Sequence, residues 1–466
     1  MQRARRAGRA RRRSFPSARL VGALVVPPLL LVSGCSDREG ADGSTERSTP
    51  SIARFASEPA GGIGTTIADP PTAPPEVPGV ELRPVDGGPD YFGQWTNSFP
   101  TDPGFFPVSV WAETLDGTGR LKDYEALGVN TFSNLWGGPT PEVMDRIKAH
   151  GLYAIAGTPD ARVTEEFDAA YGNHLAAHYF QDEGDGRDVC GDQVPRLAAL
   201  CRPSADGRTS PDALQDMADA IRDEDPTRPV YGQFTKPVAL LDYLSEPQAR
   251  AYVDGADIVS YDWYPLTDPY TPGQLWEQAD AVQTTRRLAN YAKPVWPAIE
   301  TSYVFANSAR RPGPAEVAAE VWNALIGGAR GIQYFNHSFR AGHETTHVLL
   351  EPEYQDVAAA VRVTNLRIAE LAPVLNADYA HGFVKVTKGT VNQMTKAHDG
   401  SFFLFVAARS ERPQDVTLDL TGVGDTSATV LYEDRSVEVT DGRLTDTFDG
   451  AEAVHVYRID PERDQA

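Results

Sequence analysis

Residues 294–335 have the sequence PVWPAIETSYVFANSARRPGPAEVAAEVWNALIGGARGIQYF. Two short apolar runs, 294–299 and 331–335, have the length and the residue types of buried strands. Between them, EVAAEVWNALIGGARG carries apolar residues at helical spacing and then glycines, which commonly follow a helix. A strand, a helix and a second strand in this order predict a parallel βαβ unit, because parallel strands need a crossover connection.

The same alternation of apolar runs and helical stretches extends over residues 89–374. Thr140-Pro141, Ser210-Pro211 and Thr271-Pro272 each place a capping hydroxyl before a proline and predict helix starts. Eight strands in about 230 residues predict an α/β fold of the (β/α)8 TIM barrel type. The alternative is an open doubly wound sheet, which is expected to show a glycine-rich phosphate loop that this sequence lacks. The predicted strands are 106–111, 129–136, 152–157, 175–180, 229–234, 257–264, 294–299 and 331–335.

The pattern changes after about residue 375. The runs HGFVKVT, SFFLFVAARS, DVTLDLTG, SATVLYED and AVHVYRI are separated by turns rich in Asp and Gly, without a helical stretch. Short alternating strands with turn signals between them are typical of an all-β domain. We therefore expect a β-sandwich over residues 375–466, after the barrel of residues 89–374.

Residues 1–34 resemble a signal peptide. A basic segment precedes a 13-residue apolar run, Leu20 to Val32, which is too short to span a bilayer. RRSF, residues 12–15, is compatible with twin-arginine export or with an ordinary basic region. VSGC, ending at Cys35, resembles a bacterial lipobox, which implies lipidation of Cys35 and an extracytoplasmic, membrane-anchored protein. Residues 35–88, rich in Ser, Thr, Pro and Gly, are expected to form a flexible tether.

The charge excludes one class of partner. The whole chain has a formal net charge of −22, and the predicted signal contains eight arginines and no acidic residue. A mature chain more acidic still should repel nucleic acid and anionic membrane surfaces. We expect a monomer whose only membrane contact is the lipid.

Two cysteines remain beyond the lipobox, Cys190 and Cys201. In an exported protein, this spacing predicts a local disulfide, with two unpaired buried thiols as the alternative. Two cysteines alone cannot form a structural zinc site.

A TIM barrel places its chemistry at the carboxyl ends of the strands. Two predicted strands are followed directly by a glutamate: Glu183 in YFQDEGDG after the fourth strand, and Glu300 in VWPAIETS after the seventh. Strands four and seven lie across the barrel mouth, so these carboxyl groups can face each other over a ligand. Retaining glycoside hydrolysis needs such a pair, one carboxylate as nucleophile and one carboxylic acid as proton donor. The alternative is that QDEGDG is only a solvated acidic loop.

The two glutamates, the C-terminal β-sandwich and the EVWNALIGGARGIQYF segment resemble the clan A retaining glycoside hydrolases over roughly residues 90 to 460. The resemblance implies Glu300 as nucleophile, Glu183 as acid/base, and no metal or organic cofactor. Either Tyr264 or Tyr261 matches a tyrosine that hydrogen-bonds the nucleophile in many members. The family usually has Asn before the acid/base, whereas this sequence has Asp182, which puts the recognition of one sugar hydroxyl in doubt.

Further side chains at the strand ends are candidates for contact with an oligosaccharide or polysaccharide. Aromatic rings stack on sugar rings, although packing at the barrel rim is an equally ordinary role for them. The predicted substrate-binding residues are Asp182, Tyr264, Tyr261, Trp111, Trp136, Gln233, Asn336 and His337. The predicted substrate is an extracellular or cell-wall glycan.

Two other functions remain open. HETTH, residues 343–347, matches the H-E-x-x-H pattern of zinc peptidases, which requires a helix to place both imidazoles on one face. The pair Thr345-Thr346 and the nearby Pro352 disfavour a helix there. The third possibility is a surface carbohydrate-binding protein without catalysis.

Overall fold

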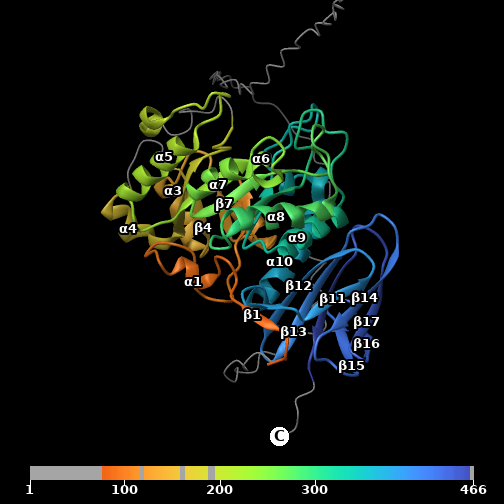
Figure 1. Cartoon of the computed structure of the whole chain (residues 1–466). Helices are drawn as coiled ribbons and strands as arrows, with labels where there is room; N and C mark the ends of the chain where they lie inside the picture. Colours follow the sequence, from red (N-terminus) through yellow and green to blue (C-terminus); the bar gives the residue numbers. More distant parts are fainter. Residues whose placement is uncertain (1–75, 116–119, 158–162, 187–194, 462–466) are drawn as a thin grey trace, which may run out of the picture. The chain divides into compact units, whose positions relative to one another are not determined.

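We analysed a computed structural model, which describes residues 76–115, 120–157, 163–186 and 195–461 (Figure 1). Eight parallel strands form a closed barrel in the order β2 to β9, and β9 pairs with β2 to close it. The predicted barrel is confirmed, as is each of its eight strands to within a few residues. The strands are β2 (Val108–Trp111), β3 (Thr131–Ser133), β4 (Tyr153–Ala156), β5 (Leu175–Gln181), β6 (Val230–Thr235), β7 (Ile258–Asp262), β8 (Val295–Glu300) and β9 (Ile332–Phe335).

Helices follow the strands, and some begin at the predicted caps. The Thr140 and Ser210 hydroxyls accept hydrogen bonds from the Val143 and Ala213 N–H groups, which satisfies amides that lack partners in the first turn. The helices are α1 (Pro89–Phe92), α2 (Arg120–Ala126), α3 (Pro141–Ala149), α4 (Glu165–Tyr171), α5 (Pro211–Glu224), α6 (Lys236–Leu240), α7 (Glu246–Asp254), α8 (Gln278–Leu288), α9 (Pro314–Gly327) and α10 (Gln355–Leu375). Short 3-10 turns span Gly172–His174, Pro195–Leu200, Leu275–Glu277, Val348–Leu350 and Pro352–Tyr354. None of the helices in the described ranges is long and apolar enough to cross a membrane.

The helix start predicted at Thr271-Pro272 is wrong. Residues 271–274 form no helix, and α8 begins at Gln278 after a 3-10 turn. The Gly273 N–H donates to the Pro265 carbonyl, 2.9 Å away. Pro272 therefore belongs to a loop that folds back on the end of β7.

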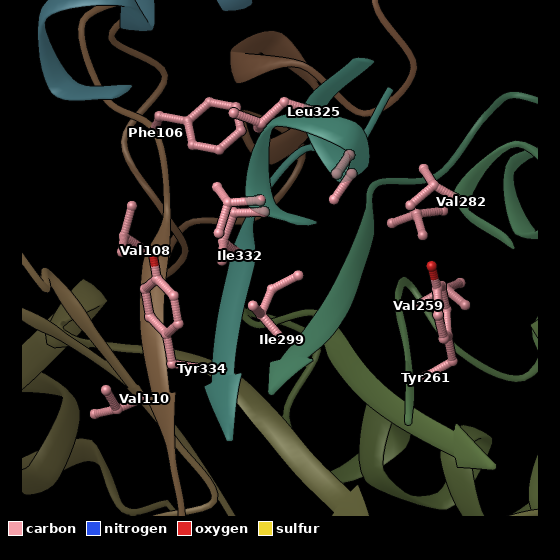
Figure 2. Close-up of a cluster of buried hydrophobic side chains, with 14 of the residues drawn as sticks. Phe106, Val108, Val110, Val259, Tyr261, Val282, Ile299, Leu325, Ile332 and Tyr334 are labelled. Carbon is pink, nitrogen blue, oxygen red and sulfur yellow. The ribbon is translucent and has the colours of Figure 1, made fainter. Parts of the chain in front are cut away.

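The side chains of the strands alternate between the helices and the barrel interior. Figure 2 shows the outer set, in which residues of β2, β7, β8 and β9 pack with Val282 of α8 and Leu325 of α9. These outer residues are Val108, Val110, Val259, Tyr261, Ile299, Ile332 and Tyr334. The alternate residues therefore face the barrel interior, among them Trp296, Ala298 and Glu300 of β8.

A polar layer crosses the barrel interior. The Ser133 and Tyr231 hydroxyls donate to Gln333 Oε1, at 2.6 and 2.7 Å. The Gln333 amide in turn donates to Gln233 Oε1 at 3.2 Å. Ile155, Ile258 and Trp296 belong to one apolar cluster of buried residues. Gln233 of the polar layer donates to Asp262 at the carboxyl end of β7.

The second sheet has ten strands and is antiparallel. Phe402 and Leu404 of β13 share one apolar cluster with Val416 of β14 and Leu444 of β17, which lie several strands away in the hydrogen-bonding order. The sheet thus folds over on itself, consistent with the predicted β-sandwich. Its strands are β1 (Glu81–Arg83), β10 (Asp378–His381), β11 (Val384–Lys388), β12 (Val391–His398), β13 (Ser401–Ala408), β14 (Gln414–Leu420), β15 (Thr426–Val430), β16 (Arg435–Thr440), β17 (Arg443–Phe448) and β18 (Val454–Ile459).

One strand of this sheet comes from the segment predicted as a tether. Strand β1 pairs with β10 and places Leu82 opposite Ala380. The end of the 35–88 segment is therefore part of the folded protein, and the sheet is not built from C-terminal residues alone. The predicted signal peptide and Cys35 lie outside the described residues.

Candidate active site

Several carboxyl groups gather at the carboxyl ends of the barrel strands. Asp262 is the last residue of β7, Glu300 is the last of β8, and Asp182 and Glu183 follow β5 directly. A register shift between Tyr179 and Gln181 interrupts the pairing of β5 with β6 just before these acids. Irregularities of this kind change the direction of the side chains that follow them.

Glu300 is held by the loop after β7. The Leu266 N–H donates to Glu300 Oε1 at 2.7 Å. Burial raises the pKa of Glu300 to about 7, while hydrogen bonds from Thr267 and Leu266 lower it. The second oxygen, Oε2, has no hydrogen-bond partner among the described residues. The residue is fully buried in this conformation, so a substrate reaches that oxygen only if neighbouring side chains at the barrel mouth move.

A second buried glutamate lies behind Glu300. Glu320 of α9 accepts a hydrogen bond from the Gln278 amide at 3.0 Å, and Gln278 accepts one from the Tyr261 hydroxyl at 2.9 Å. Burial and the negative charge of Glu300 raise the pKa of Glu320 well above its ordinary value. The charge of Glu300 therefore favours the protonated form of Glu320, because two adjacent buried carboxylates cannot both ionise at low cost.

Glu183 has a different environment. Its backbone lies in the left-handed region, with φ of 46°, which is uncommon outside glycine and is found at functional sites. The residue as a whole is exposed. Burial of its carboxyl group, and then the charges of Asp182 and Asp185, nevertheless raise its pKa to about 8. Glu183 therefore retains its proton at neutral pH, as a general acid must.

Asp182 and Asp262 share a hydrogen-bonded network with the polar layer. The Tyr179 hydroxyl lies 2.9 Å from both Asp182 Oδ1 and Gln233 Oε1, and the Gln233 amide donates to Asp262 Oδ1 at 2.5 Å. Burial raises the pKa of Asp182 to about 6. Burial and the charges of Asp182 and Glu183 raise the pKa of Asp262. Each negative charge among these acids thus favours the protonated form of its neighbours.

Asp185 fixes the loop that carries Glu183. Its two oxygens accept hydrogen bonds from the Thr235 N–H and hydroxyl, both at 2.6 Å. Arg208 Nη1 lies 3.5 Å from the Asp185 carboxylate and donates to its carbonyl at 2.9 Å. The Gly184 N–H donates to the Gln233 carbonyl at 3.0 Å, so the loop is bound to the end of β6. The acidic run is thus structured, and the alternative of a solvated loop is wrong for Asp185.

The predicted aromatic contacts divide into exposed and packed residues. Trp136 is 55% exposed and stacks on His337, with ring centroids 5.8 Å apart. Trp111 is partly buried; it stacks on Phe335 at 5.2 Å, and its indole N–H donates to the Tyr179 hydroxyl at 3.3 Å. Trp136 is therefore a free ring surface at the barrel mouth, whereas Trp111 supports the Tyr179 network.

Four predicted substrate contacts are buried in the protein instead. Tyr261 faces the helices and donates to Gln278, because residues 258, 260 and 262 occupy the inward positions of β7. The Gln233 side chain donates a hydrogen bond to Asp262 and accepts one from Gln333, both within the polar network. The Asn336 side chain donates to Glu113 Oε2 at 2.9 Å and accepts from the Leu349 N–H at 2.9 Å. His337 is buried against the Ala112 carbonyl, and burial lowers its pKa to about 4.

Tyr264 is buried but belongs to the site. It packs on Phe335 with ring centroids 5.1 Å apart, and the charges of Asp262 and Glu183 add to burial in raising its pKa. The hydrogen bonds to Glu300 come from Leu266 and Thr267, so the role of holding Glu300 belongs to these residues rather than to Tyr264 or Tyr261.

The HETTH segment does not form the helix that a zinc peptidase motif requires. Thr345 pairs with Ser338 in an isolated β-bridge. His343 Nδ1 lies 2.7 Å from Glu353 Oε1, and His347 Nδ1 lies 2.6 Å from Glu113 Oε1. The two imidazoles therefore have separate carboxylate partners. In the described ranges, no group of three His, Cys, Asp or Glu side chains is arranged to hold a metal ion.

Two residues of the hydrogen-bonded network around Asp182 were not predicted from sequence. For Asp262, the position at the carboxyl end of a predicted strand was the available signal. Tyr179 carries no recognisable signal, since an apolar strand commonly contains a tyrosine. Cys190 lies outside the described residues, so its disulfide with Cys201 stays a prediction.

No protein-family model matches this sequence, and no curated protein matches it either. Several solved structures are similar in the arrangement of the chain. A structure described as a glycoside hydrolase has a TM-score of 0.48 at 12% identity, covering 82% of this chain and 100% of its own. A GH42 β-galactosidase from G. stearothermophilus has a TM-score of 0.48 at 10% identity, with 76% and 98% covered. An α-L-arabinofuranosidase from Thermotoga maritima has a TM-score of 0.44 at 11% identity, with 75% and 96% covered. Likenesses this distant carry no conclusion about function, which has to be argued from the site itself.

Proposed function

We propose that this protein hydrolyses glycosidic bonds with retention of anomeric configuration. The observation that carries the proposal is the contrast between two glutamates at the strand ends. Glu300 has one oxygen held by a backbone N–H, the other without a hydrogen-bond partner among the described residues, and a pKa raised to about 7, whereas the pKa of Glu183 is raised to about 8. Between these two values Glu300 is mostly ionised and Glu183 mostly protonated, which is the division that a nucleophile and an acid need.

In the proposed reaction, the Glu300 carboxylate attacks the anomeric carbon. As the bond to the leaving oxygen breaks, Glu183 gives that oxygen its proton, and a glycosyl ester of Glu300 forms. Water then attacks the same carbon, Glu183 takes a proton from it, and the Glu300 carboxylate is released. Two displacements on one carbon give net retention.

The surrounding residues support each role. The negative charge of Asp182 beside Glu183 favours the protonated form of Glu183, which can then donate its proton to the leaving oxygen. Hydrogen bonds from Leu266 and Thr267 favour the ionised form of Glu300. The exposed ring of Trp136 supplies a surface for a sugar ring.

The first experiment is a screen of glycan substrates with the product anomer followed by NMR. The product that forms first should have the anomeric configuration of the substrate, before the two anomers of the free sugar equilibrate. Glu300→Gln and Glu183→Gln should each lower kcat by at least about 10³-fold with the fold retained, because each removes one reacting group. Glu344→Gln is the matched control, since Glu344 is the general base that the zinc alternative requires.

The outcomes separate the candidate functions. Full activity of Glu300→Gln, or product of inverted configuration, would refute the mechanism. Binding of glycans without turnover by the unaltered protein would favour the carbohydrate-binding alternative.

We also propose that the protein acts outside the cytoplasm on an extracellular or cell-wall glycan, as a monomer anchored through lipidated Cys35. The support is the resemblance of VSGC and the preceding apolar run to a lipoprotein signal. Cys35→Ser should move the protein from the membrane fraction to the soluble fraction without changing kcat. Retention in the membrane fraction would contradict the anchor.

A further inference from the structure

A pocket of about 320 Å³ lies against the second sheet, away from the carboxyl ends of the barrel strands. Its barrel side consists of residues near the ends of α8 and α9, which precede the amino ends of β8 and β9. Its sheet side consists of residues of β1, β10, β11 and β12. A cavity of this volume is at the small end of the range of ligand pockets. It is a different place from the site of Glu183 and Glu300.

Two arginines give the pocket an excess of positive charge. Arg83 Nη2 lies 2.5 Å from Asp86 Oδ1, and Arg286 Nε lies 2.5 Å from Asp86 Oδ2. Two guanidinium groups thus share one buried carboxylate, which balances only one of them. The Arg83 side chain is 36% exposed, so an anion in solvent can reach its charge, whereas Arg286 is mostly buried and also donates to the Gly327 carbonyl at 2.9 Å. Positive charge at this point contrasts with the net charge of −22 of the whole chain.

Tyrosine rings hold both guanidinium groups. The Arg83 guanidinium lies 5.1 Å from the centre of the Tyr291 ring and 5.8 Å from that of Tyr379. The Arg286 guanidinium lies 5.5 Å and 5.1 Å from the same two rings. Such cation–π contacts fix the direction in which a guanidinium can donate. The Tyr291 backbone, with φ of 54°, is in the left-handed region, so this ring is presented at a conformational cost.

Two hydroxyl groups on residues that line the pocket are buried and have no hydrogen-bond partner among the described residues. They are Tyr379 Oη and Thr395 Oγ1, and their residues are only 5% and 6% exposed. A buried hydroxyl without a partner is unusual and costs about 1–3 kcal/mol. Each can donate to an oxyanion.

The titratable groups nearby respond to the same positive charge. Burial, together with Arg83, Arg286 and Lys396, lowers the pKa of His381. Burial, with Arg330 and Arg286, lowers the pKa of Lys396 well below its ordinary value. The acidic residues close to this cluster are Asp86, Asp378 and Glu81, the last of which is exposed opposite His381. An anion entering the pocket would therefore meet a positive field.

We infer that this pocket binds the oxyanion group of a small ligand, a phosphate or the carboxylate of an acidic sugar, through Arg83, Arg286, Tyr379 and Thr395. Paired guanidinium groups and hydroxyl donors are the groups that recognise these anions. The inference does not depend on hydrolysis at the barrel mouth.

The test is calorimetric titration of the full chain at constant ionic strength, with inorganic phosphate in one series, glucuronate in a second and chloride in a third. We expect binding of phosphate or glucuronate with a dissociation constant of about 1 mM or tighter, and no binding of chloride. Saturation in only one of the first two series identifies which anion the pocket takes.

Variants connect the binding to the pocket. Tyr379→Phe and Thr395→Val keep the packing volume, and each should weaken binding about tenfold, because each removes a hydrogen bond to a charged group. Arg83→Gln should weaken it at least as much. Arg443→Gln, on the exposed face of β17, is the matched control and should bind normally. Absence of saturable binding, or equal affinity in all four variants, would overturn the inference.

Discussion

Asp182 is the residue at which a small change should most clearly report on the proposed acid. Asp182→Asn is nearly isosteric, and the Asn oxygen can still accept the hydrogen bond from Tyr179, 2.9 Å away. The substitution removes one negative charge next to Glu183, whose pKa that charge helps to raise to about 8. It also installs the residue that the resembling family usually carries at this position.

The size of the effect follows from the charges involved. Two unit charges about 8 to 10 Å apart interact by roughly 2 kcal/mol at an effective dielectric constant of about 20. Because part of Glu183 is open to solvent, we expect the lower end of that energy, a fall in the Glu183 pKa of about one unit. The basic limb of the pH profile of kcat/KM should then move from about pH 8 to about pH 7. At pH 8 this is a loss of about fivefold in activity.

The two limbs of the pH profile should respond differently to the substitution. Glu183 acts protonated, so activity is lost as pH rises through its pKa, and a lower pKa moves that loss to lower pH. Glu300 acts ionised, so activity is gained as pH rises through its pKa of about 7, which the substitution should leave nearly unchanged. The profile is measured by hydrolysis of a substrate from the screen, with Glu438→Gln on the exposed face of β16 as a control that removes the same charge. A basic limb that stays in place or moves to higher pH in Asp182→Asn would refute the electrostatic role.

Three further predictions concern other parts of the molecule. Trp136→Ala should raise KM about three- to tenfold with little change in kcat, since a lost stacking contact is worth about 1 kcal/mol. The control Tyr432→Ala, on the second sheet, should change neither constant. An unchanged KM in Trp136→Ala would contradict the proposed role of Trp136. Glu300→Gln should increase the free energy of unfolding more at pH 8 than at pH 5, by about 2–3 kcal/mol. The reason is that a carboxyl group whose pKa is raised to about 7 in the folded protein loses its stabilising contribution as pH rises from its ordinary pKa through 7. Denaturant titration of both proteins at the two pH values measures the difference, and an equal effect at both pH values would contradict the prediction. Dialysis against a chelator should leave hydrolysis unchanged, because the HETTH segment is not helical and its two histidines have separate carboxylate partners; loss of activity that zinc restores would revive the peptidase alternative.

The sequence predicted the barrel and the positions of its two glutamates with little error. Each strand is a short apolar run, and several helices begin at recognisable capping residues. Strands and helix starts can therefore be predicted from residues that are close in the chain. Glu183 and Glu300 follow their strands directly. The barrel topology then brings every strand end to the same side of the barrel.

Side-chain direction and long-range pairing were decided only by the tertiary structure. Tyr261 was predicted to contact substrate, but a shift of one residue in a strand exchanges its two faces, and the end of a strand cannot be placed that exactly from sequence. The three residues of β1 carry no local signal and become a strand only through pairing with β10, almost 300 residues later. In the same way, Asn336 and His347, which follow the last barrel strand, meet Glu113, which follows the first. The raised pKa values also depend on tertiary contacts, through burial for Glu300 and through burial and neighbouring charges for Glu183. Local sequence determines which elements form, whereas the surroundings of each side chain depend on contacts between distant residues.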